Sequence, residues 1–445
     1  MIKSVDFNNN VIWVGIVLFI AVITGIAIAN ESWLYLGIAL SPLIIYLCIE
    51  KPFIFPLGLY VFLIPFDTVL LTNISYITSM TKLLGIITIV VLFLKGAFEN
   101  KLIKPDATSF WWMLFIMYVV LSAWWAIETE RVLTKLTTVA GLLLLYLIVS
   151  SYKTQKYEYE ILKWCILVGG LLVSIFSIYN YEIGNFRNED ITRSTLSVGE
   201  NYTNPNRVAF SYLIPFAICL EMLLNQKKKI MKALFGSVLC LILFAIVISG
   251  SRGCMLSISV IIIVYILSIK QRITFCTILI IIGILLMSYV PDFVIERWGK
   301  ALDDGGSGRL DIWYVGCKAI EKYWLIGAGY GNYPNAYDEF INYAPNFKGY
   351  HRPSHNTYLG IFVELGVIGF TLMLLAIMKH YRVIQSRFNQ YNLDIVMLKA
   401  SFWAILVSCL FTDSVGKKAF WVLWMMIMMY KNISEDVIVH RKALR

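Results

Sequence analysis

The sequence predicts an all-α integral membrane protein with about 12–14 transmembrane helices and one large extracytoplasmic loop. The first observation is composition: of 445 residues, 59% are hydrophobic and 15% are charged, and the mean hydropathy is +0.73. A soluble domain has roughly 25% charged residues. The second is that the hydrophobic residues form long runs, and a helix needs about 17–25 residues to cross a bilayer. The third is that segments rich in Lys and Arg recur between these runs, as cytoplasmic loops do.

The transmembrane helices are predicted from the length of the apolar runs. The first run lacks a small-residue cleavage site and is followed by others, so we predict a retained helix and not a signal peptide. About fourteen runs meet the length criterion, and they are centred near residues 20, 41, 60, 90, 118, 142, 170, 216, 241, 261, 282, 366, 404 and 424.

Basic segments predict the orientation of these helices. Five of them lie an even number of runs apart and therefore share one side: residues 153–156, 227–229, 270–272, 379–387 and 431–445. The positive-inside rule assigns this side to the cytoplasm, with both termini inside. Four other segments are then predicted outside: residues 181–207, 250–253, 291–354 and 412–416. The same rule accounts for the formal net charge of +10, so we predict no nucleic-acid partner.

The chain is predicted to form a single membrane domain in three parts. Residues 1–199 and 378–445 supply flanking helices, the latter with a cytoplasmic tail, and residues 200–377 include the large outer loop, 291–354. The eight cysteines have no paired spacing of the kind found in a disulfide framework or a zinc site. We predict no metal site.

Arg252 lies in the sequence Gly250-Ser251-Arg252-Gly253, where one predicted span ends and the next begins. Two interpretations are open. The side chain extends to the bilayer surface to keep its charge in water, as arginines at helix ends do. Alternatively, its planar guanidinium binds the phosphate oxygens of a lipid-linked substrate.

The large outer loop contains a glycine-rich turn, residues 305–309. Apolar residues recur after it at intervals of three and four, which predicts an amphipathic helix that lies on the membrane or on the helix bundle: Leu310, Trp313, Cys317, Ile320 and Trp324. Ser307 or Gly308 would cap this helix. Arg309 would lie in its first turn, where a diphosphate could meet an arginine and free backbone N–H groups. The alternative is an ordinary loop before a helix.

The remainder of the loop is rich in aromatic residues, both within 327–333 and after it, at Tyr337, Tyr343, Phe347 and Tyr350. These rings either provide apolar faces for sugars or pack the loop on itself and on lipid headgroups, where Tyr and Trp are common.

Two of the four histidines, His351 and His355, lie at the outer end of the next predicted span. An imidazole has an ordinary pKa near 6.5 and accepts a proton readily at neutral pH. Glu364 follows His355 about half a turn out of phase on a helix, which favours a structural partner for Glu364 over a catalytic pair. Asp413, in the last outer segment, is a candidate to orient His355 or a substrate hydroxyl, or to cap a helix.

Four short motifs, taken in order, resemble the shared domain of bacterial O-antigen ligases and O-antigen-type polysaccharide polymerases. They are Ser251-Arg252-Gly253; Gly308-Arg309 with Ile312-Trp313; Gly327-Ala328-Gly329-Tyr330-Gly331; and His355-Asn356-Thr357-Tyr358-Leu359 with Glu364-Leu365-Gly366 and Gly369. The resemblance covers roughly residues 200–375. It implies a GT-C-like membrane glycosyltransferase that takes glycan from undecaprenyl diphosphate without a metal or other cofactor.

The resemblance also implies residue roles. His355 looks like the catalytic base, and Asp413 is similar in position to a helper carboxylate, by topology alone. Arg252 and Arg309 look like the diphosphate-binding arginines. Four further residues would line the path of the acceptor or the glycan: Asn206, Arg207, Tyr330 and Asn356.

The implied reaction is a single displacement with inversion, on the outer face of the bacterial inner membrane. A repeat-unit polymerase, which we favour, extends a lipid-linked chain, whereas a ligase moves polymer to lipid A core. Flippase and chain-length regulator proteins are expected partners. A lipid or polysaccharide transporter is the alternative from another class. Transporters usually carry ionisable residues near the bilayer midplane, whereas the polar residues here gather at one face.

Overall fold

The computed structural model describes residues 33–74, 77–186, 193–198, 201–269, 272–273, 276–277, 283, 289–299, 305–387 and 392–443. Its α-helices are α2 (Trp33–Glu50), α3 (Leu57–Leu63), α4 (Met80–Phe98), α5 (Ala107–Leu121), α6 (Thr129–Ser150), α7 (Lys156–Glu182), α8 (Pro205–Ser211), α9 (Leu213–Asn225), α10 (Lys229–Ile248), α11 (Arg252–Ser268), α13 (Asp292–Gly299), α14 (Gly305–Tyr323), α15 (Tyr333–Glu339), α16 (Thr357–Ser386), α17 (Leu393–Cys409) and α18 (Lys418–Ala443).

Short elements connect these helices. The 3-10 helices are η1 (Ile64–Phe66), η2 (Ser122–Trp124) and η3 (Ile341–Tyr343). The strands form two small antiparallel pairs, β1 (Leu71–Ile74) with β2 (Ile77–Ser79) and β3 (Ser197–Val198) with β4 (Asn201–Tyr202). The predicted all-α fold class is therefore confirmed.

Among the described residues, seven helices have the length and apolar composition to cross a membrane: α4, α6, α7, α10, α16 and the combined helices Ala107–Trp124 and Pro205–Asn225. They coincide with the runs predicted near residues 90, 118, 142, 170, 216, 241 and 366. Shorter apolar helices, Ser41–Glu50, Leu57–Phe66 and Arg252–Ser268, lie at three further runs, and α17 and α18 lie at the runs near 404 and 424. The run near 20, the predicted retained first helix, lies outside the described residues, as does most of the run near 282, so the total number of spans stays a prediction.

Residues 205–225 form the centre of the bundle. α9 packs against α7, α10 and α17, and α17 packs against α11. All residues from Leu213 to Met222 are buried, as expected of a helix that is apolar on every side. The segment begins at Asn204, whose side chain accepts a hydrogen bond from the backbone N–H of Asn206, and Pro205 occupies the first turn, where no N–H is needed.

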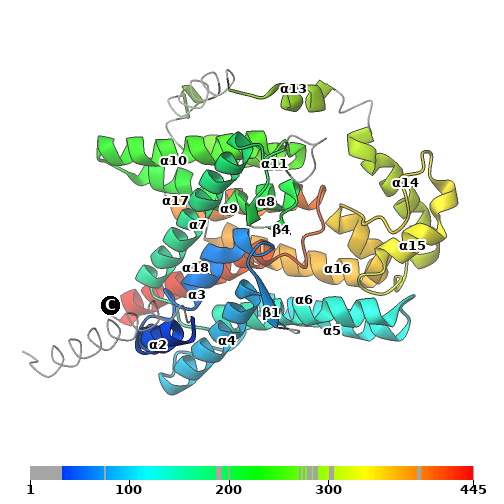
Figure 1. Ribbon diagram of the computed structural model, residues 1–445. Helices are drawn as coiled ribbons and strands as arrows, with labels where there is room; N and C mark the ends of the chain where they lie inside the picture. Colours follow the sequence, from blue (N-terminus) through cyan, green and yellow to red (C-terminus); the bar gives the residue numbers. More distant parts are fainter. Residues whose placement is uncertain are drawn as a thin grey trace, which may run out of the picture.

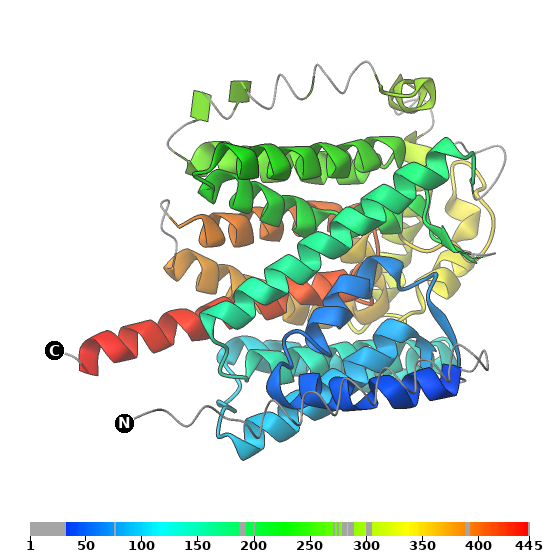
Figure 2. The same ribbon diagram turned by 60° about the vertical axis from the view of Figure 1, so that its left-hand side comes forward.

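The loop elements gather at one end of this bundle. α14 and α15 lie on the right of Figure 1 and the C-terminus lies on the left, and Figure 2 keeps that separation after a 60° turn. α14 confirms the predicted loop helix. Of its predicted apolar stripe, Leu310, Cys317 and Trp324 are exposed, whereas Trp313 and Ile320 pack against the core of the loop. Ile312, Val315 and Ala319 are buried, because the helix packs this face against α15 and α16.

A break in α16 fixes this loop to the membrane bundle. Gly366 has φ +62° and ψ −168°, which interrupts the helix. Residues 324–329 fill the gap through backbone hydrogen bonds: Ala328 N donates to Val363 O (2.9 Å), Gly329 N to Glu364 O (2.8 Å) and Val367 N to Trp324 O (2.8 Å). A Cβ on Gly327 would lie 2.2 Å from Glu364 O, and one on Gly366 would lie 2.2 Å from Leu325 O. Glycine is required on both sides of this contact.

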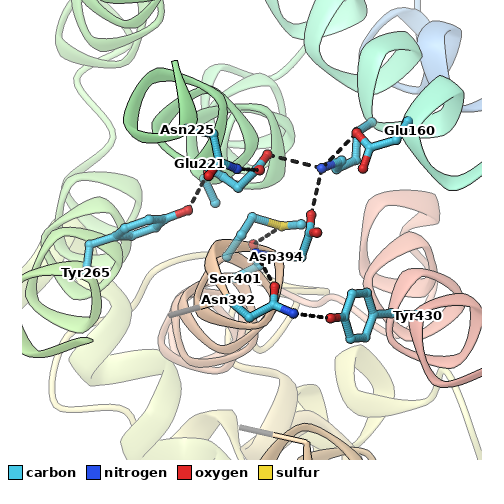
Figure 3. Close-up of polar contacts among 11 residues, drawn as sticks. Glu160, Glu221, Asn225, Tyr265, Asn392, Asp394, Ser401 and Tyr430 are labelled. Carbon is cyan, nitrogen blue, oxygen red and sulfur yellow. Dashed lines mark hydrogen bonds and ion pairs between the residues drawn. The ribbon is translucent and has the colours of Figure 1, made fainter. Parts of the chain in front are cut away.

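A buried ionic cluster joins helices at the other end. Lys163 on α7 contacts Asp394 on α17 (2.6 Å), Glu221 on α9 (3.2 Å) and Glu160 one turn earlier on its own helix (3.0 Å). Figure 3 shows these contacts and the neighbouring hydrogen bond from Asn225 to Glu221. The side chains of Lys163 and Glu221 are only 2% and 3% exposed. This cluster links three helices.

Candidate active site

Three of the four segments predicted outside meet around a cavity of about 710 Å³, which we call the cationic cavity. Six of its lining residues carry a cationic side chain: Arg193, Arg252, Arg297, Arg309, Lys348 and Arg352. His355 also lines it, and no Asp or Glu is among its described lining residues. Such an excess of positive charge beside an open volume favours an anionic ligand.

Arg252 and Arg309 reach the cavity from two different elements. Arg252 begins α11, where its Nη1 donates to Arg297 O (3.0 Å) and its Nη2 donates to Ser307 Oγ (2.8 Å). The glycine-rich turn is left-handed at Gly306, Ser307 and Gly308, with φ values of 69°, 67° and 76°. The regular part of α14 therefore starts at Arg309, in the predicted first-turn position. Burial, and then the charges of Arg252 and Arg297, lower the pKa of Arg309.

Arg193 is a cavity residue that the sequence analysis missed. Its Nε donates to Ser249 O (2.7 Å) and its Nη2 donates to Asn206 Oδ1 (2.8 Å). Burial lowers its pKa to about 9, and the charges of neighbouring arginines add to this effect. The sequence showed only that Arg193 lies in the outer segment 181–207, and no motif surrounds it that would have indicated a binding residue.

Arg297, Lys348 and Arg352 were missed as well. A Cβ on Gly250, whose φ is +56°, would lie 3.5 Å from both Arg193 and Arg297, so these two side chains cover the turn before Arg252. Lys348 pairs with Asp311 (3.2 Å), and Arg352 Nε donates to Lys348 O. The sequence showed only that all three residues lie in the large outer loop. That position does not distinguish a residue that binds a ligand from any other basic residue of the loop.

His355 lies on the wall of the cationic cavity, in the turn that precedes α16. Its backbone has φ +48°, which is uncommon outside glycine. Burial lowers the pKa of its imidazole, and the charges of Arg309, Lys417 and Arg352 lower it further, whereas Asp413 opposes the shift. His355 is therefore neutral at pH 7 and able to accept a proton.

The turn between α17 and α18 holds this segment in place. Ser354 Oγ donates to the Asp413 carboxylate, Thr357 Oγ1 donates to Thr412 O (2.5 Å), and Ser414 N donates to Thr357 Oγ1 (3.0 Å). These bonds bring Asp413 close to His355, two residues that are far apart in sequence. Behind Ser354 lies a second cavity of about 260 Å³, the carboxylate chamber, which Asp413 and Glu364 line.

The remaining predicted residues divide between these spaces. Asn206 lines the cationic cavity, whereas Arg207 and Tyr330 line the carboxylate chamber. Asn356 caps α16: its Oδ1 accepts from Tyr358 N (3.0 Å) and Leu359 N (3.2 Å). It is not among the described lining residues of either space, so its place on a glycan path stays a prediction.

Glu364 has the structural partner expected from its helical phase. Its Oε1 accepts a hydrogen bond from Tyr333 N (3.2 Å), at the start of α15. This bond adds to the backbone contacts between the loop and the break in α16. The glycine-rich segment 327–331 thus has a packing role.

Residues 235–374 match the sequence model of the O-antigen ligase family. The chain contains an O-antigen ligase domain. The predicted family is confirmed, and the match falls inside the predicted region 200–377 and includes Arg252, Arg309 and His355. Arg193, Asn206, Arg207 and Asp413 lie outside the matched residues, so flanking parts of the chain also line the two cavities. No curated protein matches the chain.

Proposed function

We propose that this protein transfers an undecaprenyl-diphosphate-linked glycan to a sugar hydroxyl at the outer face of the bacterial inner membrane. One observation carries the proposal: a neutral histidine, His355, lies on the wall of a cavity with six cationic side chains. A diphosphate ester needs this charge for binding, and the attacking hydroxyl needs a base. The O-antigen ligase domain supports a glycosyltransferase of this kind.

The proposed reaction is one displacement at the anomeric carbon. His355 takes the proton of the acceptor hydroxyl as its oxygen forms a bond to this carbon. The bond from the carbon to the diphosphate oxygen breaks, and undecaprenyl diphosphate leaves with the electron pair. Attack from the opposite side inverts the configuration.

Arg252 and Arg309 stabilise the negative charge that develops on the leaving diphosphate, where fixed donors contribute most to catalysis. Burial, and then the charges of Arg252 and Arg297, lower the pKa of Arg309, and the repulsion between these arginines is relieved when the diphosphate binds. Because these side chains supply the positive charge, we propose that the transfer needs no metal ion.

Asp413 is proposed to keep His355 ready for the reaction. Its charge favours the imidazolium form that arises when His355 takes the proton. It also anchors the preceding residue through Ser354 Oγ. Asp413 is therefore proposed as a positioning residue.

We propose a repeat-unit polymerase for O-antigen or a related surface polysaccharide as the specific activity. The second candidate is an O-antigen ligase that uses lipid A core as acceptor, and the description of the matched family favours it. The two activities share the lipid-linked donor and the displacement described above. They differ only in the acceptor molecule, which is a lipid-linked repeat unit for the polymerase and lipid A core for the ligase.

The test is complementation of a strain that lacks this gene with His355→Ala, with the surface polysaccharide separated as a size ladder. We expect a loss of about 10²–10⁴-fold in transfer, the usual contribution of a general base, at unchanged membrane abundance. His351→Ala is the matched control, because His351 lies in the same segment but is 67% exposed and pairs with Asp338.

The residual product identifies the activity. A core that bears one repeat unit indicates a polymerase, whereas bare core with long lipid-linked chains indicates a ligase. A normal ladder from His355→Ala would refute the proton-transfer role and favour the transporter alternative.

A further inference from the structure

A third cavity, of about 420 Å³, lies beside α4 and α6, outside the O-antigen ligase domain. Its walls differ from one end to the other. Lys82, Arg207 and Lys418 line one end together with Asp67, and the side chains of Ile86, Ile89, Leu142 and Leu145 line the other. A cavity with this division suits an amphiphile and not a free sugar.

The polar end has an excess of positive charge. Asp67 accepts from Arg207 Nη2 (3.2 Å) and from Lys418 Nζ, and Lys418 also donates to Thr81 Oγ1 (2.6 Å). Asp67 is the one carboxylate among the described lining residues, against three cations. The head group that fits here is therefore an anion, such as a phosphate.

The apolar end lies along two membrane-spanning helices. Ile86 and Ile89 follow the start of α4 by about 9–14 Å at the rise of an α-helix. The side chain of Ile86 is 45% exposed. Gly141 on α6 lines the same wall, and a Cβ built on it would meet nothing within 4 Å. This wall therefore has room for a hydrocarbon chain at the depth of the bilayer.

The cavity also adjoins the catalytic region. Arg207 and Gly416 line both this cavity and the carboxylate chamber. Ser354 lines that chamber, and its neighbour His355 lines the cationic cavity. A lipid held by its phosphate at Arg207 would thus direct its sugars toward the segment of Ser354 and His355 through the carboxylate chamber and not through the cationic cavity.

We propose that this acceptor-lipid cavity, lined by Lys82, Arg207, Lys418, Ile86 and Gly141, binds the phosphate-bearing lipid anchor of the acceptor. The inference rests on the proposed glycan transfer. It assigns the two lipids to separate sites: the donor diphosphate at Arg252 and Arg309, and the acceptor lipid between α4 and α6.

The test uses Gly141→Leu in the purified full-length protein, reconstituted in lipid nanodiscs. The donor is lipid-linked polymer. The acceptor is either the undecaprenyl-diphosphate-linked repeat unit or lipid A core, both isolated from a strain that lacks this gene. Because the new side chain occupies the cavity, we expect the KM for the acceptor to rise about tenfold, with the KM for the donor unchanged. The acceptor that supports transfer in this assay identifies which of the two lipids supplies the phosphate bound in the cavity.

Gly236→Leu is the matched control, because Gly236 also lies on a spanning helix with nothing within 4 Å of its Cβ, but it is not among the described residues that line this cavity. Lys82→Gln tests the polar end independently of packing: it should raise the acceptor KM, and Lys82→Arg should restore it.

The outcomes separate the two proposals. A wild-type protein without transfer in either arm refutes the proposed function. An active wild type whose acceptor KM is unchanged by both Gly141→Leu and Lys82→Gln overturns the acceptor-lipid cavity alone. An equal rise in the donor KM also overturns it, because the two lipids would then share one site.

Discussion

Lys163 and Arg309 are both cations set among helices of the same bundle, but their surroundings are opposite. Lys163 has three carboxylates within 3.2 Å (Figure 3). Arg309 has Arg252 and Arg297 as its main charged neighbours and opens onto about 710 Å³. A charge that is partly buried in the protein without a counter-charge is costly, so its presence beside a cavity favours a ligand of opposite charge. A buried cation surrounded by carboxylates, such as Lys163, therefore indicates a role in holding the helices together. A cation beside other cations and a cavity, such as Arg309, indicates a binding site for an anion.

The largest effect is expected from Lys163→Met. This change leaves the carboxylates of Glu221 and Asp394 without their cation inside the bundle. Removing one partner of a buried ionic pair costs about 3–5 kcal/mol. We expect much lower membrane abundance and a lower unfolding temperature in detergent, with normal activity in each molecule that still folds.

A compensated variant tests the cause. Adding Glu221→Gln and Asp394→Asn to Lys163→Met removes the unpaired charges and should recover part of the abundance. Wild-type stability of Lys163→Met alone would show that the cluster does not hold α7, α9 and α17 together.

Arg309→Gln is expected to lower activity without lowering stability, the opposite of Lys163→Met. Loss of one fixed cation at the diphosphate should reduce transfer by about 10²–10³-fold, as does loss of an oxyanion donor. The unfolding temperature should stay the same or rise, because Arg252 and Arg297 lose a like charge nearby. Transfer assays and thermal unfolding of the same preparation measure both effects. Destabilisation as large as that of Lys163→Met would contradict the comparison.

A smaller effect is expected in the pH dependence of transfer. Burial lowers the pKa of His355, so the basic, neutral form persists below pH 6.5, and activity falls only under more acidic conditions. Asp413 opposes that shift, so Asp413→Asn should move the acid limb of kcat/KM to still lower pH while Arg309, Lys417 and Arg352 continue to repel the proton. A limb that moves to higher pH, or does not move, would contradict the electrostatic role of Asp413.

The smallest effect is expected from an exposed pair on α14. Lys318 contacts Glu321 at 2.8 Å, and both side chains have ready access to water. Pairs of this kind contribute little. Lys318→Gln should leave abundance, unfolding temperature and transfer unchanged, which makes it a control for the other charge substitutions.

The sequence was sufficient to predict the fold class and the family match, and it named Arg252, Arg309 and His355, which line one cavity in the structure. Long apolar runs are a direct property of the sequence, and the motifs around Arg252, Arg309 and His355 are local. The positive-inside rule grouped the outer segments, and the cationic cavity forms where three of them meet. No distant contact was needed for these predictions.

Other features depend on contacts between distant residues and could not be predicted. Lys163 meets its partners on α9 and α17 across 58 and 231 positions of sequence. Arg193 has no motif, and its role depends on the turn at Gly250 and on Asn206. The side of α14 that packs against α15 and α16, with Ile312, Val315 and Ala319, does not follow from its local pattern. The walls of the acceptor-lipid cavity resemble any apolar helix until α4 and α6 are placed together.

The break in α16 at Gly366 has a consequence for exchanging outer loops between relatives. Main-chain atoms of residues 324–329 and 363–367 anchor the loop at this break, so this part of the attachment depends on backbone shape. The buried side of α14 and the bond from Tyr333 N to Glu364 add side-chain contacts. A chimera that replaces residues 305–354 should therefore keep its register on the host when Gly327, Gly329 and Gly366 are preserved together with these side-chain contacts.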